Sequence, residues 1–500
     1  MMEHTGKHVF VTGRAGTGKS TLLDYFRNNT NKKVAVLAPT GVAALNVKGQ
    51  TIHSFFKFKP DVTVEKVRKL RRNDSERSIY KQLDAILIDE ISMVRADLLD
   101  CVDTFLRLHG PDKRKPFGGI QMLFVGDLYQ LPPVLSGKER EVFSSLYETP
   151  YFFSAAAFEH LDMEFIELEK IYRQQDEQFI RLLNAIRNNT ITEEGLALLN
   201  QRYLPDYEPP FDDFYLYLTT TNEMAERINS QQIDRLDGTL YTFSGRIDGE
   251  FGKEYLPTSV ELKVKAGAQI MMLTNDSSRR WVNGTIGKIA AVTIERDSTP
   301  VLFVELANGE EVEITPWVWH IFKFFIEDGQ LQSEVMGTFT QYPLMLAWAV
   351  TIHKSQGKTF DKVIIDIGRG TFAHGQMYVA LSRCTRLDGI VLKKPLAKKH
   401  IWTDYKIMKF LTKYQYQKAE EACSVDDKVA IIERAIAQGT ALRIVYLKPN
   451  DEKSKREIEP AYVGEMEFNG VTYLGVQAFC RERKGERVFR VDRILEIEEL

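Results

Sequence analysis

The sequence predicts an α/β protein built on parallel β-sheets, with mostly-β segments inserted into and appended to that framework. Three apolar runs near the N-terminus, at residues 8–11, 85–88 and 121–125, each lead into a polar loop. Uninterrupted apolar runs of this length are typical of strands buried on both faces of a parallel sheet. After residue 230 the texture changes to short alternating segments around Asn-Gly pairs, which indicate antiparallel hairpins.

Composition describes an ordinary globular chain. The 500 residues are 44% hydrophobic and 27% charged, which predicts two to four domains. No apolar run reaches the roughly 18 residues of a membrane span, and no secretory signal is visible, so we expect a cytoplasmic protein. The four cysteines are far apart and predict free buried thiols. The net charge of −3 means that any contact with nucleic acid is local.

The first motif is a phosphate-binding loop between a strand and a helix. Residues 11–21 read VTGRAGTGKST and match G-x-x-x-x-G-K-[ST]. Backbone N–H groups of such a loop converge on phosphates, and the following helix N-terminus adds partial positive charge. The expected contacts to a nucleoside triphosphate come from Gly13, Ala15, Gly16, Thr17, Gly18, Lys19, Ser20 and Thr21, with Ser20 also a ligand of Mg²⁺.

Two further strands end in groups that suit the same site. Asp89 and Glu90 follow the strand at 85–88, and Gln130 follows the next strand. We expect Asp89 to hold Mg²⁺ through water and Glu90 to act as the general base toward the attacking water. Gln130 has the right chemistry to sense a γ-phosphate.

Loops after the second strand carry polar residues at the edge of the sheet where ligands bind. Residues 36–56 place Pro39, Thr40, Thr51 and His53 there, and small hydroxyls and a histidine suit contacts to a nucleic-acid backbone. A structural role for His53 is the alternative. The next stretch, 57–81, has nine basic and four acidic residues, and it is either a solvated helix face or a DNA-facing insertion.

The second half repeats the pattern of buried strands and polar loops without a second P-loop. Arg173 precedes a helix whose apolar residues recur at helical spacing, and Arg383 lies on the helix predicted in 375–392. An arginine from a second domain can complete an ATP site as an arginine finger. The polar loop residues of this half are Thr221, Asn222, His353, Lys354, Gln356 and Gly357.

An insertion at about 230–340 is predicted to form a small β-barrel. Asn308-Gly309 between two strand-like runs is a strong hairpin signal. Arg279, Arg280 and Trp281 form a cationic and aromatic set that suits backbone contact and base stacking, although a tryptophan at this position is equally typical of a core.

The C-terminal region reads as a separate domain after a polar connector at 413–428. Ser424 caps a predicted helix that stops at Gly439 and leads into a strand, and Asn469-Gly470 predicts a hairpin. The region is mostly β in texture.

The ordered motifs GRAGTGKS, APTGVAA, TIHSFF, LIDEISMV, VGDLYQLPPV, IYRQ, TTTNEMAERIN, TIHKSQGKTFDKV and YVALSRCTR resemble those of superfamily 1 DNA helicases. The similarity runs from residue 8 to about 395 and is greatest to the B-type, Pif and RecD-like branch. It implies two RecA-like P-loop domains around one ATP and its Mg²⁺, with single-stranded DNA across their top and 5′→3′ translocation. It also implies an SH3-like barrel as the insertion.

The same resemblance assigns roles by motif position. Lys19, Ser20, Asp89, Glu90 and Gln130 correspond to nucleotide-site residues, and Arg173 and Arg383 to the fingers of the second domain. Positions at or near the DNA track are Thr40, Thr51, His53, Thr221, Asn222, His353 and Gln356, and we add Pro39, Lys354 and Trp281. The implied domains are 1–150 with a basic insertion at 57–81, 151–229 with 341–412, the SH3-like insertion 230–340, the connector 413–428 and the last domain 429–500.

The last domain resembles a WYL domain, an Sm-like barrel of bacterial regulators, through RIVYL, REIEP, TYLGVQAFC and FRVDRI. Thr472 stands where the name-giving tryptophan would be. The resemblance implies a pocket for a nucleotide or single-stranded DNA, and arginines beside aromatics suit both phosphate and base. A protein-docking module is the alternative. The expected lining residues are Tyr446, Arg456, Tyr473, Arg481, Arg490 and Arg493.

Together these observations predict an ATP-dependent, monomeric 5′→3′ helicase that acts on single-stranded and forked DNA and is modulated through its C-terminal domain. Only twelve residues precede Gly13, so the family's upstream adenine-recognition segment has no counterpart, and we expect hydrolysis of several nucleoside triphosphates. The alternatives are a ligand-sensing NTPase regulator that binds DNA without unwinding it, and a translocase subunit of a nuclease complex.

Overall fold

The structure is a computed structural model that describes residues 2–70, 79–135, 143–159, 161–210, 213–294, 299–327, 330–371, 373–448 and 452–500. The chain forms two compact units. One comprises Met1–Ile186 and Ile191–Trp402, and the other Arg187–Thr190 and Thr403–Leu500. None of the described helices is long and apolar enough to cross a membrane.

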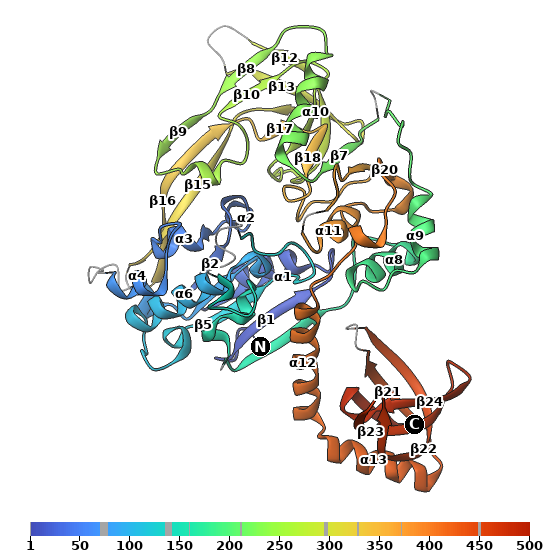
Figure 1. Cartoon of the computed structure of the whole chain (residues 1–500). Helices are drawn as coiled ribbons and strands as arrows, with labels where there is room; N and C mark the ends of the chain where they lie inside the picture. Colours follow the sequence, from blue (N-terminus) through green and yellow to red (C-terminus); the bar gives the residue numbers. More distant parts are fainter. Residues whose placement is uncertain are drawn as a thin grey trace. The chain divides into compact units, whose positions relative to one another are not determined.

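The N-terminal part of the first unit is a six-stranded sheet in the order β3-β2-β4-β5-β1-β6, with every neighbouring pair parallel (Figure 1). The strands are β1 (His8–Gly13), β2 (Val34–Ala38), β3 (Gln50–Thr51), β4 (Ala85–Ile88), β5 (Gln121–Val125) and β6 (Met163–Leu168). Its helices are α1 (Lys19–Asn29), α2 (Gly41–Asn46), α3 (Ile52–Phe56), α4 (Val64–Lys69) and α6 (Ala96–His109). The central strands are buried, as their apolar sequences predicted.

The position of β6 corrects one expected boundary. This strand pairs with β1 along its whole length, from His8 opposite Met163 to Gly13 opposite Leu168. The first half therefore extends to Leu168, and the boundary expected at 150/151 is too early. We call residues 2–168 the first half from here on.

The second half of the same unit has a four-stranded parallel sheet in the order β18-β7-β19-β20. Its strands are β7 (Leu216–Thr219), β18 (Ala349–Thr351), β19 (Val363–Asp366) and β20 (Ile390–Leu392). Its helices are α8 (Glu177–Arg187), α9 (Glu193–Asn200), α10 (Asn222–Asp234) and α11 (Gln376–Ser382). Two parallel sheets in one unit confirm the α/β class predicted from the sequence.

The insertion is antiparallel throughout its described pairs. A five-stranded sheet contains β11 (Gln269–Met272), β12 (Ile286–Thr293), β13 (Val301–Leu306), β14 (Glu311–Ile314) and β17 (Leu344–Leu346). Strands β8 (Tyr241–Ser244) and β10 (Glu261–Val264) pair beside it. Gly309, at a φ of 83°, turns the predicted hairpin between β13 and β14. Because β17 pairs with β11, the insertion continues past its expected end at residue 340.

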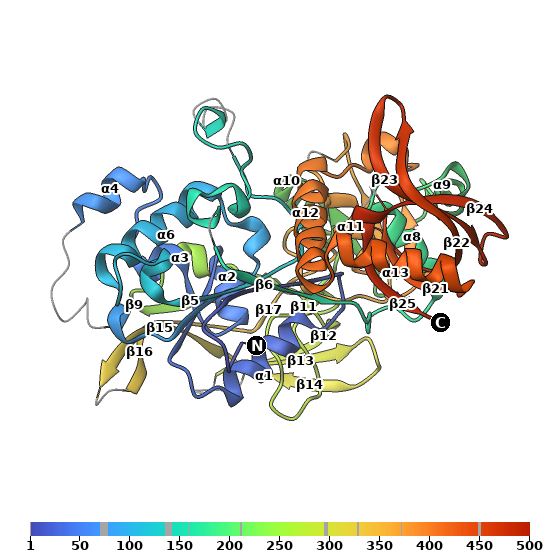
Figure 2. The ribbon, with the colours of Figure 1, turned by 90° about the horizontal axis from the view of Figure 1, so that it is seen from below.

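A long hairpin of β15 (Trp317–Glu327) and β16 (Gln330–Gln341) extends from the insertion, and β9 (Arg246–Gly249) lies along it in both views (Figures 1 and 2). Trp319, Ile321 and Phe339 of this sheet pack with Ala38 and Ala44 of the first half. The insertion and the first half thus share one hydrophobic cluster.

Short 3-10 helices complete the described elements: η1 (Ile91–Met93), η2 (Pro116–Gly119), η3 (Phe152–Ser154), η4 (Ala156–Phe158), η5 (Lys253–Tyr255), η6 (Leu387–Gly389), η7 (Lys398–His400) and η8 (Val491–Arg493).

The second unit has two helices and one antiparallel sheet. The helices are α12 (Tyr405–Ala422) and α13 (Val425–Gln438), and the sheet order is β24-β23-β22-β21-β25. The strands are β21 (Leu442–Leu447), β22 (Lys453–Phe468), β23 (Val471–Cys480), β24 (Gly485–Arg490) and β25 (Ile494–Glu499). Residues of α13 and of the strands form one core.

Local signals of this unit act as predicted. The Ser424 hydroxyl accepts from the Asp427 N–H in a capping box, and Gly439 ends α13 at a φ of 65°. Asn469 and Gly470 both have positive φ between β22 and β23, as a two-residue hairpin turn requires. The expected domain boundary at 428/429 lies inside α13, although the start of that helix after Ser424 is as predicted.

Candidate functional site

The P-loop lies between β1 and α1, where the motif predicted it. Gly16 and Gly18 have φ values of 78° and 86°, which favour glycine and allow the backbone to curl. The Lys19 ammonium donates to the Gly13 and Arg14 carbonyls at 2.7 and 3.0 Å, and the Thr17 hydroxyl donates to the Arg14 carbonyl. The loop is therefore held in its curled form by its own side chains.

The carboxylates predicted to act on the phosphates lie at the same edge of the sheet. Asp89 and Glu90 follow β4, and Asp127 and Gln130 follow β5, whose strand lies between β4 and β1. Burial raises the pKa of Asp89 to about 6. Burial, and then the charge of Asp89, raise the pKa of Glu90 to about 7, while Lys19 acts in the opposite direction on both. The Gln130 amide donates to Asp127 at 3.1 Å.

These groups fit a hydrated Mg²⁺ ion, although no cluster of three or more His, Cys, Asp or Glu side chains able to hold a metal occurs among the described residues. Ser20 offers an exposed hydroxyl and Asp89 a half-buried carboxylate. Oxygen ligands of this kind, with one or two carboxylates and several waters, are what Mg²⁺ prefers. A cation would also offset the unfavourable burial of two adjacent carboxylates.

The second half contributes two arginines to this edge. Arg173 donates to the carbonyls of Ser382 and Gly357, at 3.2 and 3.4 Å, and a Cβ added to Gly16 would lie 2.5 Å from the Arg173 Cβ. Burial lowers the pKa of Arg173. This side chain therefore packs directly against the P-loop, as expected for a residue of the nucleotide site.

Arg383 is fully buried, at 1% exposure. Its guanidinium donates to the carbonyls of Val379 and Lys358, at 3.1 and 3.2 Å. Burial, followed by the charge of Arg173, lowers its pKa to about 9, while Glu90 and Asp127 act to raise it. Among the residues that the structure describes, no carboxylate forms an ion pair with either arginine. Two arginines that form no ion pair among the described residues, near a P-loop, are suited to a polyanionic ligand.

Gln356 lies at the nucleotide edge rather than apart from it. Its side-chain amide donates to the Glu90 carboxylate at 2.9 Å, so a residue predicted for the DNA track contacts the candidate general base. Gly357, predicted to contact the nucleotide, accepts a hydrogen bond from Arg173.

Sequence reasoning missed two residues of this region. The Tyr378 hydroxyl accepts from the backbone N–H of Ala15 in the P-loop at 2.9 Å. Lys358 donates to the Asn283 side chain of the insertion at 2.8 Å, and burial lowers its pKa to about 8. Tyr378 precedes Arg383 by five residues, and Lys358 follows Gln356 by two. Position inside a recognised motif was the only available signal.

Candidate DNA-contacting residues of the first half are only partly accessible. The Thr40 side chain accepts from the Ala43 N–H and caps α2, next to half-buried Pro39. His53 is half-buried, and burial lowers its pKa. Thr51 is 5% exposed and its hydroxyl lies 2.8 Å from that of Tyr255 in the insertion. The Thr51 hydroxyl thus contacts the insertion in this conformation, and its place near the DNA track stays a prediction.

The corresponding residues of the second half are more open. Thr221 caps α10 through a bond from the Met224 N–H, and both Thr221 and Asn222 are exposed. His353 is half-buried and Lys354 is exposed. Of the basic stretch 57–81, residues 71–78 lie outside the described residues, and α4 carries part of the remainder.

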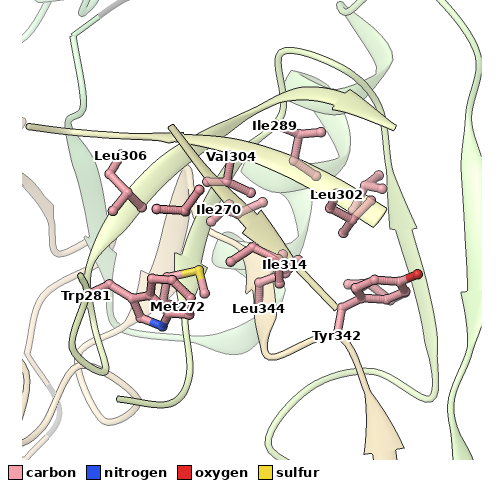
Figure 3. Packing of buried hydrophobic residues seen from close by; sticks show 13 residues of the cluster. Ile270, Met272, Trp281, Ile289, Leu302, Val304, Leu306, Ile314, Tyr342 and Leu344 are labelled. Carbon is pink, nitrogen blue, oxygen red and sulfur yellow. The ribbon is translucent and has the colours of Figure 1, made fainter. Parts of the chain in front are cut away.

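Trp281 belongs to the core of the insertion. Its side chain is 8% exposed and lies beside Met272 in the cluster shown in Figure 3. The guanidinium of Arg280 stacks over the indole at 4.7 Å and pairs with Asp276. The structure therefore favours the core interpretation of Trp281 over base stacking.

The six residues expected to line a tail pocket fall into two groups. Arg490 lies over the Tyr473 ring at 5.3 Å, and the charges of Arg493 and Arg490 act on Tyr416 of α12. Tyr446 packs against Phe489 in the same region. In the other group, Arg481 pairs with Glu459 and Glu457, and Arg456 lies opposite Ile444 on β21. Arg490 is paired as well, because its guanidinium donates to both carboxylate oxygens of Asp492, at 3.0 and 2.6 Å.

Fold and site define a P-loop protein in which a second parallel-sheet half completes the nucleotide edge with arginines. Residues 1–196 match the family model of PIF1-like helicases, and residues 427–499 match that of the WYL domain. The chain belongs to the PIF1-like helicase family. It is 32% identical over 399 residues to the ATP-dependent DNA helicase Pif1 of Bdellovibrio bacteriovorus, covering 78% of this chain and 84% of that relative.

Other relatives extend this picture. The chain is 32% identical over 447 residues to the ATP-dependent DNA helicase PIF1 of Emericella nidulans, with 77% of this chain and 58% of the relative covered, so it spans little more than half of that longer protein. A crystal structure of Bacteroides sp Pif1 with ADP-AlF4 is similar at a TM-score of 0.75 and 37% identity, covering 82% and 94% of the two chains. The Bacteroides enzyme with ADP-AlF3 and single-stranded DNA has a TM-score of 0.60, with the same identity and coverage.

Proposed function

We propose that this chain hydrolyses ATP to move 5′→3′ along single-stranded DNA and to separate the duplex ahead of it. The observation that carries the proposal is that the second half brings Arg173 against Gly16 of the P-loop and Arg383 within electrostatic reach of Glu90 and Asp127. Family membership supports it, since relatives are named ATP-dependent DNA helicases, a Bacteroides Pif1 structure contains single-stranded DNA, and another Pif1 structure concerns unwinding at forked duplex DNA.

The residues at the nucleotide edge divide the work of hydrolysis. Lys19 and the P-loop amides bind the phosphates, and Glu90, with its raised pKa, accepts a proton from the attacking water. Arg173 and Arg383 stabilise the charge that develops on the γ-phosphate, and Gln130 contacts it. Ser20 and Asp89 would hold a Mg²⁺ ion, which would supply charge neutralisation for the phosphates.

Hydrolysis becomes movement because the phosphate site belongs to both halves. Triphosphate draws the arginines of the second half toward the P-loop, and cleavage weakens that attraction. Each closure shortens the stretch of DNA held between the halves by about one nucleotide. The chain acts as a monomeric motor, since one chain supplies both halves of the site.

The DNA path in this proposal runs along the loops at the ends of both sheets. Its contacts come from Pro39, Thr40, His53, Thr221, Asn222, His353 and Lys354, of which Thr40, Thr221, Asn222 and Lys354 are exposed. Thr51 is placed near this path, Trp281 is excluded by burial, and Gln356 is assigned to the nucleotide site. Contacts to phosphates carry no sequence information. Because such contacts are electrostatic, the affinity for DNA is expected to fall steeply as the salt concentration rises.

The tail modulates the motor in this proposal. Tyr446, Tyr473, Arg490 and Arg493 combine aromatic rings with guanidinium groups, which suits a nucleotide or single-stranded DNA. Arg490→Ala is expected to weaken binding of a short oligonucleotide to the full chain while leaving ATP affinity unchanged. Equal oligonucleotide affinity of variant and wild type would assign the tail to protein docking.

Strand polarity is the direct test of the motor. Duplexes with a 5′ or a 3′ single-stranded tail are incubated with enzyme and ATP, and strand separation is followed by fluorescence. We expect unwinding of the 5′-tailed duplex and ATP hydrolysis stimulated by oligo-dT. Unwinding of the 3′-tailed duplex alone would reject the B-type direction. Hydrolysis that is indifferent to oligo-dT, or ligand-gated binding to specific duplex sites without unwinding, would reject the motor.

A further inference from the structure

Tyr378 joins the two halves at a point where phosphate is expected to bind. Its hydroxyl accepts from the Ala15 N–H at 2.9 Å, and the side chain is 4% exposed. Ala15 is a residue of the P-loop, whose backbone N–H groups are the donors to a bound phosphate. The Ala15 N–H group therefore has two alternative acceptors. One is the tyrosine hydroxyl of the second half, and the other would be an oxygen of a bound phosphate.

The helix that carries Tyr378 is firmly docked at its start. Gly375 caps α11 at a φ of 71°, and an added Cβ there would lie 2.3 Å from the Tyr129 carbonyl and 2.4 Å from that of Gln130. Every residue of α11 is buried. A shift of Tyr378 away from the P-loop therefore moves a packed helix and not a free side chain.

The same helix carries the buried arginine. Arg383 follows α11 as its C-cap residue, and its guanidinium bonds back to the Val379 carbonyl. The other arginine, Arg173, donates to the carbonyl of Ser382, the last residue of α11. The hydroxyl thus lies among the P-loop and the two arginines, where a change at one is transmitted to the others.

We propose that the Tyr378 hydroxyl competes with a nucleotide phosphate for the Ala15 N–H and so senses occupancy of the P-loop. This inference rests on the proposed nucleotide site and adds a positioning residue to it. Phosphate binding releases Tyr378, and α11 then carries Arg383 to a new position. The hydroxyl holds the halves together before the nucleotide enters and weakens nucleotide affinity by that competition.

Tyr378→Phe removes the hydroxyl and keeps the ring. The dissociation constant of a fluorescent ADP analogue is measured for the full chain without DNA. The variant no longer makes the Ala15–Tyr378 hydrogen bond that competes with the phosphate. We therefore expect it to bind the ADP analogue about 3- to 10-fold more tightly than wild type. Tyr342→Phe is the matched control: Tyr342 is also buried, and its hydroxyl bonds the Pro300 carbonyl within the insertion, so its affinity stays that of wild type.

A purely structural tyrosine gives a different pattern. The competition predicts that Tyr378→Phe also raises hydrolysis without DNA, so that the stimulation by oligo-dT shrinks by a similar factor. Unchanged or weaker ADP binding in Tyr378→Phe overturns the proposal, because the hydroxyl then either does not compete or contacts the nucleotide itself.

A second variant covers a folding failure. Tyr378→Met fills the space flexibly and also lacks the hydroxyl, so it is expected to bind ADP more tightly as well. Wild-type protein that binds no ADP would instead refute the proposed nucleotide site. Wild-type protein that binds ADP and hydrolyses ATP on DNA, with both variants unaltered, would refute the competition alone.

Discussion

Gln356 of the second half donates a hydrogen bond of 2.9 Å to the Glu90 carboxylate of the first. Glu90 is held at a φ of 50°, a conformation that few residues other than glycine adopt, so its backbone is already constrained. The amide of Gln356 adds a directional contact from the opposite half. The orientation of the candidate base thus depends on the arrangement of both halves.

Replacing Gln356 by Met keeps the length of the side chain and removes the donor. We expect kcat for ATP hydrolysis on saturating oligo-dT to fall about 10-fold, because a general base acts only when correctly oriented. Nucleotide affinity should change less than twofold. Steady-state hydrolysis and a fluorescent-nucleotide titration measure the two quantities.

Lys354→Met is the control in the same loop. Lys354 is exposed and assigned to DNA, so this variant should raise the oligo-dT concentration needed for stimulation and leave the maximal rate unchanged. A full-rate Gln356→Met enzyme would remove Gln356 from the hydrolytic step.

Arg383→Ala tests the transfer of charge from the second half. Loss of an arginine finger costs 10³-fold or more in hydrolysis, and Lys lacks the planar fork that makes several bonds at once. We therefore expect single-turnover hydrolysis to fall about 10³-fold in both Arg383→Ala and Arg383→Lys. The control is Arg386→Ala, three residues after Arg383. Arg386 forms an exposed ion pair with Asp388, so this variant should hydrolyse ATP at the wild-type rate. Wild-type hydrolysis in Arg383→Lys would mean that only the positive charge at this position matters, and not the shape of the guanidinium.

Gly41→Ala probes the contact between α2 and the insertion. The added Cβ would lie 2.1 Å from the Glu254 carbonyl, a backbone atom that cannot swing aside. Although alanine favours a helix, we expect the free energy of unfolding to drop by about 1–3 kcal/mol through overpacking. Denaturant unfolding measures it. Exposed Val42→Ala, one residue along α2, should be neutral, and a neutral Gly41→Ala would show that the insertion yields easily.

His8 makes stability depend on pH. Its Nδ1 accepts from the Met122 N–H at 2.9 Å, and burial lowers its pKa from 6.5 to about 4. The unfolded chain binds a proton below 6.5 that the folded chain refuses until about 4, so His8 destabilises the fold progressively over that window as pH falls. The contribution at pH 5 is about 2 kcal/mol.

His8→Asn removes this titration and keeps an acceptor for the Met122 N–H. Urea unfolding at pH 7 and pH 5 should show wild type losing about 2 kcal/mol more than the variant. Equal losses in the two proteins would mean that His8 is solvated enough to protonate in the folded state.

The nucleotide edge was predictable because its signals are local. Spacing within residues 13–20 defines a P-loop, and an apolar run ending at Asp89-Glu90 places two carboxylates at a strand end whatever the rest of the chain does. Strand β6 was assigned to the wrong half because its pairing with β1 joins residues about 150 positions apart. No periodicity within residues 163–168 reports such a partner.

Side-chain partners escaped prediction for a related reason. Motif position suggested that Thr51 and Gln356 lie at or near the DNA track. In the structure the Thr51 hydroxyl bonds to Tyr255 of the insertion, and the Gln356 amide donates to Glu90. In the tail, Arg481 and Arg490 look equivalent in sequence. Glutamates on the neighbouring strand pair with the first, whereas the second pairs with Asp492, two residues further on, and stacks over Tyr473. Which interactions form depends on strand register, which is nonlocal.

The polypeptide passes from one half to the other through the short segment that follows Leu168, and Tyr172 there donates its N–H to the Gly16 carbonyl at 2.8 Å. The backbone that connects the two halves is thus hydrogen-bonded to the P-loop. Together with the Ala15–Tyr378 and Gln356–Glu90 bonds, this contact links any relative movement of the two halves to the P-loop. In the proposed motor, a load on the DNA would therefore change how long ADP stays bound to the P-loop.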